Sequence, residues 1–137
     1  MTKLDYLSAV LGAGFSIVGL FAFTYPALFF SLLPDYYGNF NLHFVKDAGI
    51  AFLSSGILFL LSLKALEWKL PFMFGGALFV VLHGVFHIQM LAMGMAPTAL
   101  DFAIEVIVII SPSVLAALAV LLQFIVYRRR GGPAETD

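Results

Sequence analysis

Four long apolar runs constrain the fold of this chain more than any other feature. They cover roughly residues 4–33, 41–65, 70–94 and 98–127. Each reaches the ~20 residues that an α-helix needs to cross the hydrocarbon core of a bilayer. The strands of a membrane barrel would alternate apolar and polar residues, whereas these runs are continuous. Helices also satisfy their own backbone hydrogen bonds in lipid. We therefore expect an all-α, integral membrane four-helix bundle.

The composition excludes several other classes of protein. Hydrophobic residues make up 62% of the 137 residues and charged residues only 11%, against about 45–50% and about 25% in soluble domains. This much hydrophobicity also excludes a disordered chain. A net charge of -1 argues against a nucleic-acid-binding protein. The absence of cysteine excludes disulfides, thiolate metal sites and thiol nucleophiles.

The connections between the runs are short, which predicts the topology. Short connections make consecutive helices antiparallel neighbours, so we expect an up-down-up-down bundle. We assign residues 1–130 to a single four-span transmembrane bundle and residues 131–137 to a flexible cytoplasmic tail. The first run is about twice the 7–15 residues typical of a signal peptide. We therefore expect it to be retained as a helix.

The basic residues predict the orientation. Six of the seven lysines and arginines fall on the side that carries both termini, and only Lys46 lies near the opposite side. The positive-inside rule then places the N- and C-termini inside, in the cytoplasmic (inner) membrane. The link from Pro34 to Phe40 lies outside, where Tyr36 and Tyr37 are expected to form an outer aromatic belt.

Ionisable side chains within the predicted spans are the strongest functional signal. Such residues are costly in a membrane helix, face the bundle interior and are a functional-site hypothesis by default. They are His43, Lys46 and Asp47 in the second span, His83 and His87 in the third, and Asp101 and Glu105 in the fourth.

These residues agree in face and in depth. Within each span two of them are four residues apart, a spacing that places both on one helical face. At 1.5 Å per residue, Asp47, His87 and Glu105 each lie ~9–10 Å in from the outer end of their span. The sequence therefore predicts a cluster of imidazoles and carboxylates in the outer half of the bundle. Tyr36, Asn39 and Asn41 would form its polar mouth.

Imidazole and carboxylate together suit a transition metal, namely zinc, iron or copper. His83, His87, Glu105 and His43 are the expected ligands, with Asp47 and Asp101 as alternative ligands or as groups that orient a ligand. A b-type haem is a variant, with His43 and either His83 or His87 as axial ligands. The favoured interpretation is a small redox-associated membrane protein.

Other interpretations remain open. The Lys46 ammonium would repel a bound cation, so Lys46 favours a salt bridge or an anionic ligand, or else it snorkels towards the membrane surface. Asp101 follows Thr98 at capping-box spacing and would then only cap its helix. The cluster could be a closed structural network in an accessory subunit of a larger membrane complex. It could also serve a homo-oligomeric proton, ion or small-molecule transporter.

Small residues and prolines predict the packing of the helices. Ser8, Gly12 and Ser16 recur every fourth residue, a spacing that lets another helix approach closely. We expect such faces to pack within the bundle. Pro26 and Pro112 each remove a backbone donor and should bend their helices.

The segment from His43 to Gly56, HFVKDAGIAFLSSG, resembles a pattern in small DoxX-like bacterial membrane proteins. In both, a basic residue opens the second helix and two glycines follow. Gly12 and Gly19 in the first span are placed similarly. The resemblance implies a four-helix bundle in the cytoplasmic membrane, and some relatives are accessory subunits of quinone or sulfur redox enzymes. His83, His87 and Glu105 lie outside the pattern.

Overall fold

The computed structural model describes residues 2–64 and 66–129, and every secondary-structure element in this part of the chain is a helix. Four helical segments are long and apolar enough to cross a membrane: Lys3–Thr24, Leu42–Leu61, Lys69–Ala92 and Ala99–Arg129. The prediction of an all-helical chain with four helices able to span a membrane is confirmed for the described residues. The predicted flexible tail, residues 131–137, lies outside the described residues.

The first two spans are simple helices joined by an irregular segment. Helix α1 (Lys3–Thr24) begins with a capping box between Thr2 and Asp5. The bend expected at Pro26 is a break, because α1 ends and the short helix α2 (Pro26–Ser31) begins with this proline in its first turn. A 3-10 turn, η1 (Asp35–Tyr37), follows. Helix α3 (Leu42–Leu61) forms the second span.

The second half of the chain contains the other two spans. A 3-10 turn, η2 (Leu66–Trp68), leads into α4 (Lys69–Ala92). The fourth span changes its hydrogen bonding along its length: α5 (Ala99–Ile104) passes into a π-helix, η3 (Glu105–Ile110), and then into α6 (Ser111–Arg129). At the end of η3 the Ser111 N–H bonds to the Val106 carbonyl, five residues back. The hydropathy pattern does not predict this π-helix.

Helices α1 and α3 pack at very short range through glycines. A Cβ added at Gly19 would lie 2.3 Å from the Leu53 nitrogen and 2.6 Å from the Gly49 carbonyl oxygen. One at Gly56 would lie 2.5 Å from the backbone nitrogen of Ser16. These contacts confirm that the small residues pack within the bundle. Gly12 lies against Gly56, and Gly19, further along α1, lies against the earlier Gly49. The helices α1 and α3 are therefore antiparallel.

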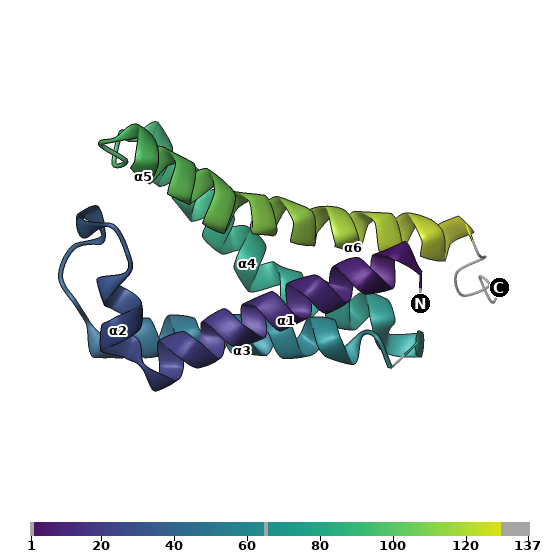
Figure 1. Cartoon of the computed structure of the whole chain (residues 1–137). Coiled ribbons are helices and arrows are strands. Elements are labelled where there is room, and N and C mark those ends of the chain that lie inside the picture. The colour runs from purple at the N-terminus through teal and green to yellow at the C-terminus, as the bar shows by residue number, and fades with distance from the viewer. Residues whose placement is uncertain (1, 65, 130–137) are drawn as a thin grey trace.

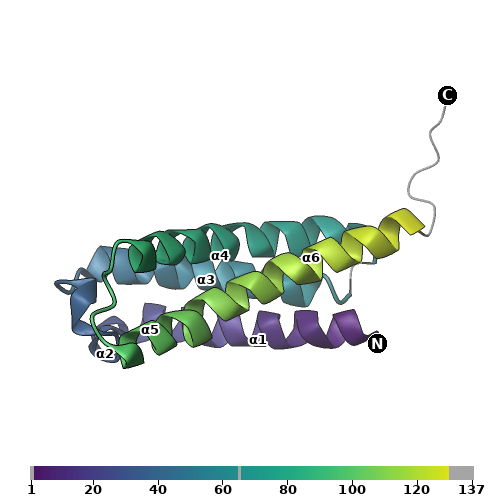
Figure 2. The same ribbon diagram turned by 90° about the horizontal axis from the view of Figure 1, so that it is seen from above.

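The helices are held together at one end and diverge at the other. An ion pair between Asp5 and Lys69 joins the beginnings of α1 and α4. Figure 1 shows α1 and α3 separating from α4, α5 and α6 towards the end at which α2 and α5 lie. The dark-blue turn η1 rises above α2 between the two groups (Figure 1). In the view from above, α4 overlies α3 and α5 overlies α2 (Figure 2). We call this end of the bundle the η1 end.

The apolar core lies between the helices. Its fully buried large side chains include Phe59, Met73 and Val80. Most other large apolar side chains are exposed on the outside of the bundle, as expected for helices that face lipid. The functional question therefore concerns the few polar groups that the bundle encloses.

Candidate functional site

Glu105 is the centre of a buried polar cluster at the η1 end. Its side chain is 1% exposed. Oε2 lies 2.6 Å from Nδ1 of His87, and Oε1 accepts hydrogen bonds of 2.6 Å from the hydroxyls of both Tyr36 and Tyr37. A buried carboxylate is costly unless charged or hydrogen-bonding partners surround it. Three strong partners satisfy that requirement here.

His87 comes from the neighbouring helix α4 and is equally buried, at 1% exposure. Nδ1 of His87 lies at hydrogen-bonding distance from Oε2 of Glu105, and the Tyr37 hydroxyl lies 3.4 Å from the same Nδ1. The sequence prediction that the third and fourth spans bring His87 and Glu105 together is therefore met. The pair links α4 to the beginning of η3.

Tyr36 and Tyr37 close the cluster from the side of the irregular segment. Their rings stack with centroids 5.0 Å apart. Burial raises the pKa of both phenols above the ordinary value of 10.0, and the hydrogen bonds to the Glu105 carboxylate raise it further. Both hydroxyls therefore remain protonated donors across the physiological pH range. Tyr36 was expected at the mouth of the site, whereas Tyr37 was expected only in an aromatic belt.

The π-helix accounts for the direction of the Glu105 side chain. Ser113, eight residues later, also faces α4, where its hydroxyl donates to the Val80 carbonyl. In a regular α-helix eight residues turn the chain by ~80° beyond two full turns, so the two side chains would diverge. A π-helix contains the equivalent of one extra residue, which reduces the divergence to ~20°. Both side chains then reach the same neighbour.

His83 lies one turn from His87 in a mostly aromatic setting. The two imidazole centroids are 4.5 Å apart. Phe79 stacks on the His83 ring, and Phe52 from α3 meets it edge-on. His83 thus extends the polar cluster from His87 towards the middle of the bundle, in contact with α3.

The second span does not deliver its ionisable residues to this cluster. His43 and Asp47 are exposed on α3. The Lys46 ammonium lies over the ring of Phe23 on α1, 5.1 Å from its centroid, which is a cation–π contact. The expected convergence of three spans is therefore reduced to α4, the beginning of η3 and the turn η1. His43 and Asp47 lie on the other side of α3 from its buried glycines.

The remaining predicted residues have local structural roles. Asp101 forms a capping box with Thr98 at the beginning of α5, and its charge also contributes to the raised pKa of Tyr36. Asn41 caps α3, since its Oδ1 accepts from the Phe44 N–H at 3.1 Å. Asn39 is exposed.

The four predicted metal ligands do not all lie together in the described part of the chain. Within residues 2–64 and 66–129, no group of three or more His, Asp and Glu side chains is arranged to hold an ion. His43 is exposed, and the Nδ1 of His87 is occupied by Glu105. The expected set of His43, His83, His87 and Glu105 therefore does not surround one point.

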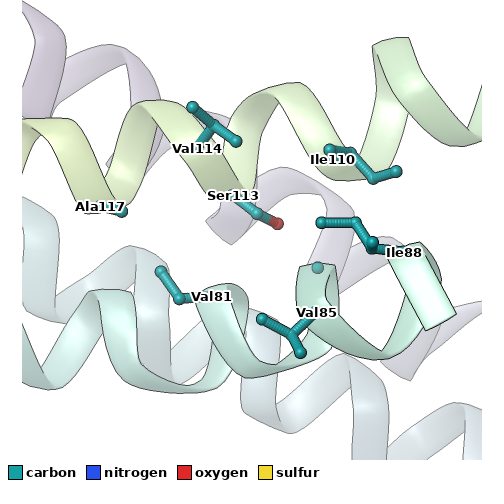
Figure 3. A pocket seen from close by; sticks show the side chains of 8 residues that line it. Val81, Val85, Ile88, Ile110, Ser113, Val114 and Ala117 are labelled. Carbon is teal, nitrogen blue, oxygen red and sulfur yellow. The ribbon is translucent and has the colours of Figure 1, made fainter.

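A hollow between α4 and α6 differs in character from the His87–Glu105 cluster. It has a volume of about 90 Å³ and an almost entirely apolar lining that includes Val81, Val85, Ile88 and Ile110 (Figure 3). Its one polar side chain, Ser113, points towards α4. The hydroxyl bonds to the Val80 and Ile109 carbonyls. With its polar group already bonded, this hollow offers no chemistry comparable to the His87–Glu105 cluster.

Comparison of the chain with protein-family models, with curated proteins and with solved structures finds no match.

Proposed function

We propose that this chain is a small multi-pass protein of the cytoplasmic membrane in which His87 and Glu105 bind and release a proton. The observation that carries the proposal is the 2.6 Å contact between imidazole and carboxylate, both buried within apolar helices. Histidine and glutamate within membrane spans are the usual components of proton relays. A proton-linked transporter or a redox-associated protein would both use such a site.

The surroundings of the pair support this assignment. Tyr36 and Tyr37 are polar, lie outside the spans and contact Glu105 directly. They connect the carboxylate to the segment between α2 and α3, where the chain leaves the apolar helices. His83 supplies a second imidazole on the inner side of His87. Protonatable groups therefore line up from the η1 end towards the middle of the bundle.

The proposal includes an orientation. Lys3, Lys64, Lys69, Arg128 and Arg129 lie at or beyond the span ends opposite η1. The positive-inside rule places that end of an up-down-up-down bundle in the cytoplasm, with both termini. The polar cluster then opens towards the extracytoplasmic side. The resemblance of residues 43–56 to DoxX-like proteins implies a bundle in the cytoplasmic membrane, and this prediction agrees with the proposed orientation.

Purified protein in proteoliposomes that contain a pH-sensitive dye tests the proposal. We expect an imposed pH gradient to collapse faster than in empty liposomes. Glu105→Gln and His87→Gln should each slow this proton flux by at least ~100-fold, the lower range of the effect of a positioned proton-transfer group. Asp35→Asn is the matched control, because Asp35 is an exposed acid of η1.

Infrared difference spectroscopy between acidic and alkaline buffer separates proton binding from flux. The protein should show a carboxylic acid band that disappears in Glu105→Gln and persists in Asp35→Asn. A protein with no such band and no flux above empty liposomes would not have the proposed function.

A bound transition metal or b-type haem is a second candidate for the redox-associated interpretation. One observation favours it: Glu105 holds the Nδ1 of His87, as carboxylates do behind metal-bound histidines. His87 would then bind the metal through its other ring nitrogen. Elemental analysis and the visible spectrum of gently extracted protein test this candidate, and a blank result in both would remove it. A purely structural role in an accessory subunit predicts instead that Glu105→Gln lowers the yield and changes no activity.

A further inference from the structure

Two ionisable side chains of α3 lie on the outside of the bundle, His43 at the end of the span and Asp47 one turn inside it. His43 and Asp47 are exposed and one helical turn apart. Helix α3 (Leu42–Leu61) is one of the four candidate spans. At 1.5 Å per residue, Asp47 lies ~8 Å inside the end of this span. Neither residue belongs to the His87–Glu105 cluster.

These two side chains form part of a continuous surface, which we call the α3 outer face: His43, Asp47, Ile50 and Ser54. All four are exposed. At ~100° per residue they fall within ~60° of the helix circumference. Gly49 and Phe59, which are buried against the rest of the bundle, point away from this face.

Nothing within the described bundle neutralises the α3 outer face. Among the described residues the ion pairs are Asp5–Lys69 and His87–Glu105. Lys46, the neighbouring cation, lies over Phe23 of α1. A carboxylate exposed to lipid is costly, and hydrocarbon offers it no hydrogen-bond donor. The α3 outer face therefore needs a partner that supplies one.

We propose that the partner is a second copy of this chain, which packs its own α3 outer face against the first. The face is self-complementary, because an imidazole donor and a carboxylate acceptor lie one turn apart on it. A two-fold axis along the membrane normal makes the two α3 helices parallel. Each His43 then lies beside Asp47 of the partner subunit, and the two contacts are equivalent.

The other two residues of the face suit this arrangement. Ser54 is small and carries a hydroxyl, and such residues let membrane helices approach closely and hydrogen-bond across the contact. Ile50 lies between Asp47 and Ser54 along the helix and supplies apolar contact there. A different partner helix would need its own donor and acceptor at the same spacing, whereas a second copy has them by symmetry.

A cysteine cross-link tests the dimer directly. The chain has no cysteine, so Ser54→Cys introduces a single thiol on the proposed symmetry axis. In lipid-diluted proteoliposomes, mild oxidation should give a disulfide-linked dimer. Leu82→Cys on α4 is the matched control: Leu82 is also exposed and lies at a similar distance from the η1 end of its helix. Equal cross-linking of the two variants would overturn the proposal.

An exchange of the two ionisable residues tests the pairing. His43→Asp places two carboxylates opposite each other, and Asp47→His places two imidazoles opposite each other. Each single variant should raise the Kd of the dimer in liposomes, measured by energy transfer between labelled copies, by ~3- to 30-fold. The double variant His43→Asp/Asp47→His restores complementarity and should return the Kd to within about threefold of the original.

Both side chains are exposed, so their exchange leaves the interior of the bundle unchanged. Unaltered circular dichroism of the variants checks this. The double variant is decisive, because a Kd as weak as in the single variants would contradict the His43–Asp47 pairing. A cross-link from Ser54→Cys to a different protein, without a homodimer, would also overturn the proposal.

Discussion

At the scale of single residues, Glu105 shows how a charged group is kept inside an apolar bundle. Its two oxygens take partners from different parts of the chain: the imidazole of His87 and the phenols of Tyr36 and Tyr37. Removing the carboxylate would leave these buried partners without an acceptor, which costs ~1–3 kcal/mol for each unsatisfied group. The cluster therefore fixes the position of η1 and supplies the candidate chemistry at the same time.

The raised pKa values of Tyr36 and Tyr37 predict a loss of stability in alkali. Above pH 10.0, the ordinary pKa of tyrosine, the unfolded chain releases phenolic protons that the folded protein retains. The contribution of these two phenols to the free energy of unfolding should therefore be constant below this pH and fall as the pH rises above it. Chemical unfolding in detergent, followed at pH values on both sides of 10.0, measures the decline.

The control for this prediction uses a tyrosine outside the cluster. The variant Tyr36→Phe/Tyr37→Phe should show a smaller decline than the original protein, and Tyr25→Phe, which alters an exposed tyrosine, should show the same decline. An alkaline decline that is equal in all three proteins would contradict the role of the two buried phenols.

The candidate site was predictable from the sequence in part. The matched depth of His87 and Glu105 in neighbouring spans was sufficient to bring those two together. Tyr37 was missed because an aromatic residue next to a span has an ordinary interfacial role, and only the path of η1 turns it inward. His43 and Asp47 were misplaced because a shared face does not reveal whether that face points inward or outward. In the structure this face of α3 is exposed and points away from the bundle.

At the scale of helices, the contact between α1 and α3 depends on glycine at named positions. Gly19→Ala introduces a methyl group only 2.3 Å from the Leu53 backbone nitrogen, and backbone cannot move aside as a flexible side chain can. We expect a loss of ~1–3 kcal/mol in the free energy of unfolding, as for other overpacked sites. Thermal or denaturant unfolding in detergent measures it.

Gly14→Ala is the matched control on the same helix, because nothing lies within 4 Å of a Cβ at Gly14. Its stability should be unchanged or slightly higher, since alanine favours the helix. Similar losses in the two variants would indicate that helix propensity, and not the contact with α3, sets the effect.

The π-helix η3 predicts an unusual tolerance to deletion. Its extra residue is what allows Glu105 and Ser113 to face α4 together. Deletion of Val108, an exposed residue of η3, should convert this segment to a regular α-helix and keep both contacts. The shortened protein should retain the fold and the carboxylic acid band of Glu105 in the infrared spectrum.

Deletion of Leu118 provides the comparison. Leu118 is also exposed, but it lies in the regular helix α6 between the buried Ala116 and Ala119. Its removal rotates one part of α6 relative to the other by ~100° and should strongly reduce the yield of folded protein. If the two deletions are equally harmful, η3 does not act as a one-residue insertion.

At the scale of the whole molecule, hydropathy alone was sufficient to predict four membrane helices, because run length and composition determine whether a helix can span a bilayer. It was not sufficient to predict the break at Pro26 or the π-helix, since both depend on how a span meets its neighbours. The divergence of the helices towards the η1 end also has no signature in the hydropathy pattern. Where the two groups of helices diverge, the turn η1 lies between them (Figure 1).

The bonds from Tyr36 and Tyr37 to Glu105 join an early part of the chain to its last span. Domains synthesised on ribosomes fold from the N-terminal side first, at ~5–20 residues per second. The two phenols are therefore made several seconds before the carboxylate that accepts their hydrogen bonds. Until the fourth helix has entered the bilayer, the turn that carries them has no acceptor at this place. The hydrogen bonds from Tyr36 and Tyr37 to Glu105 can therefore form only after the last span has been inserted.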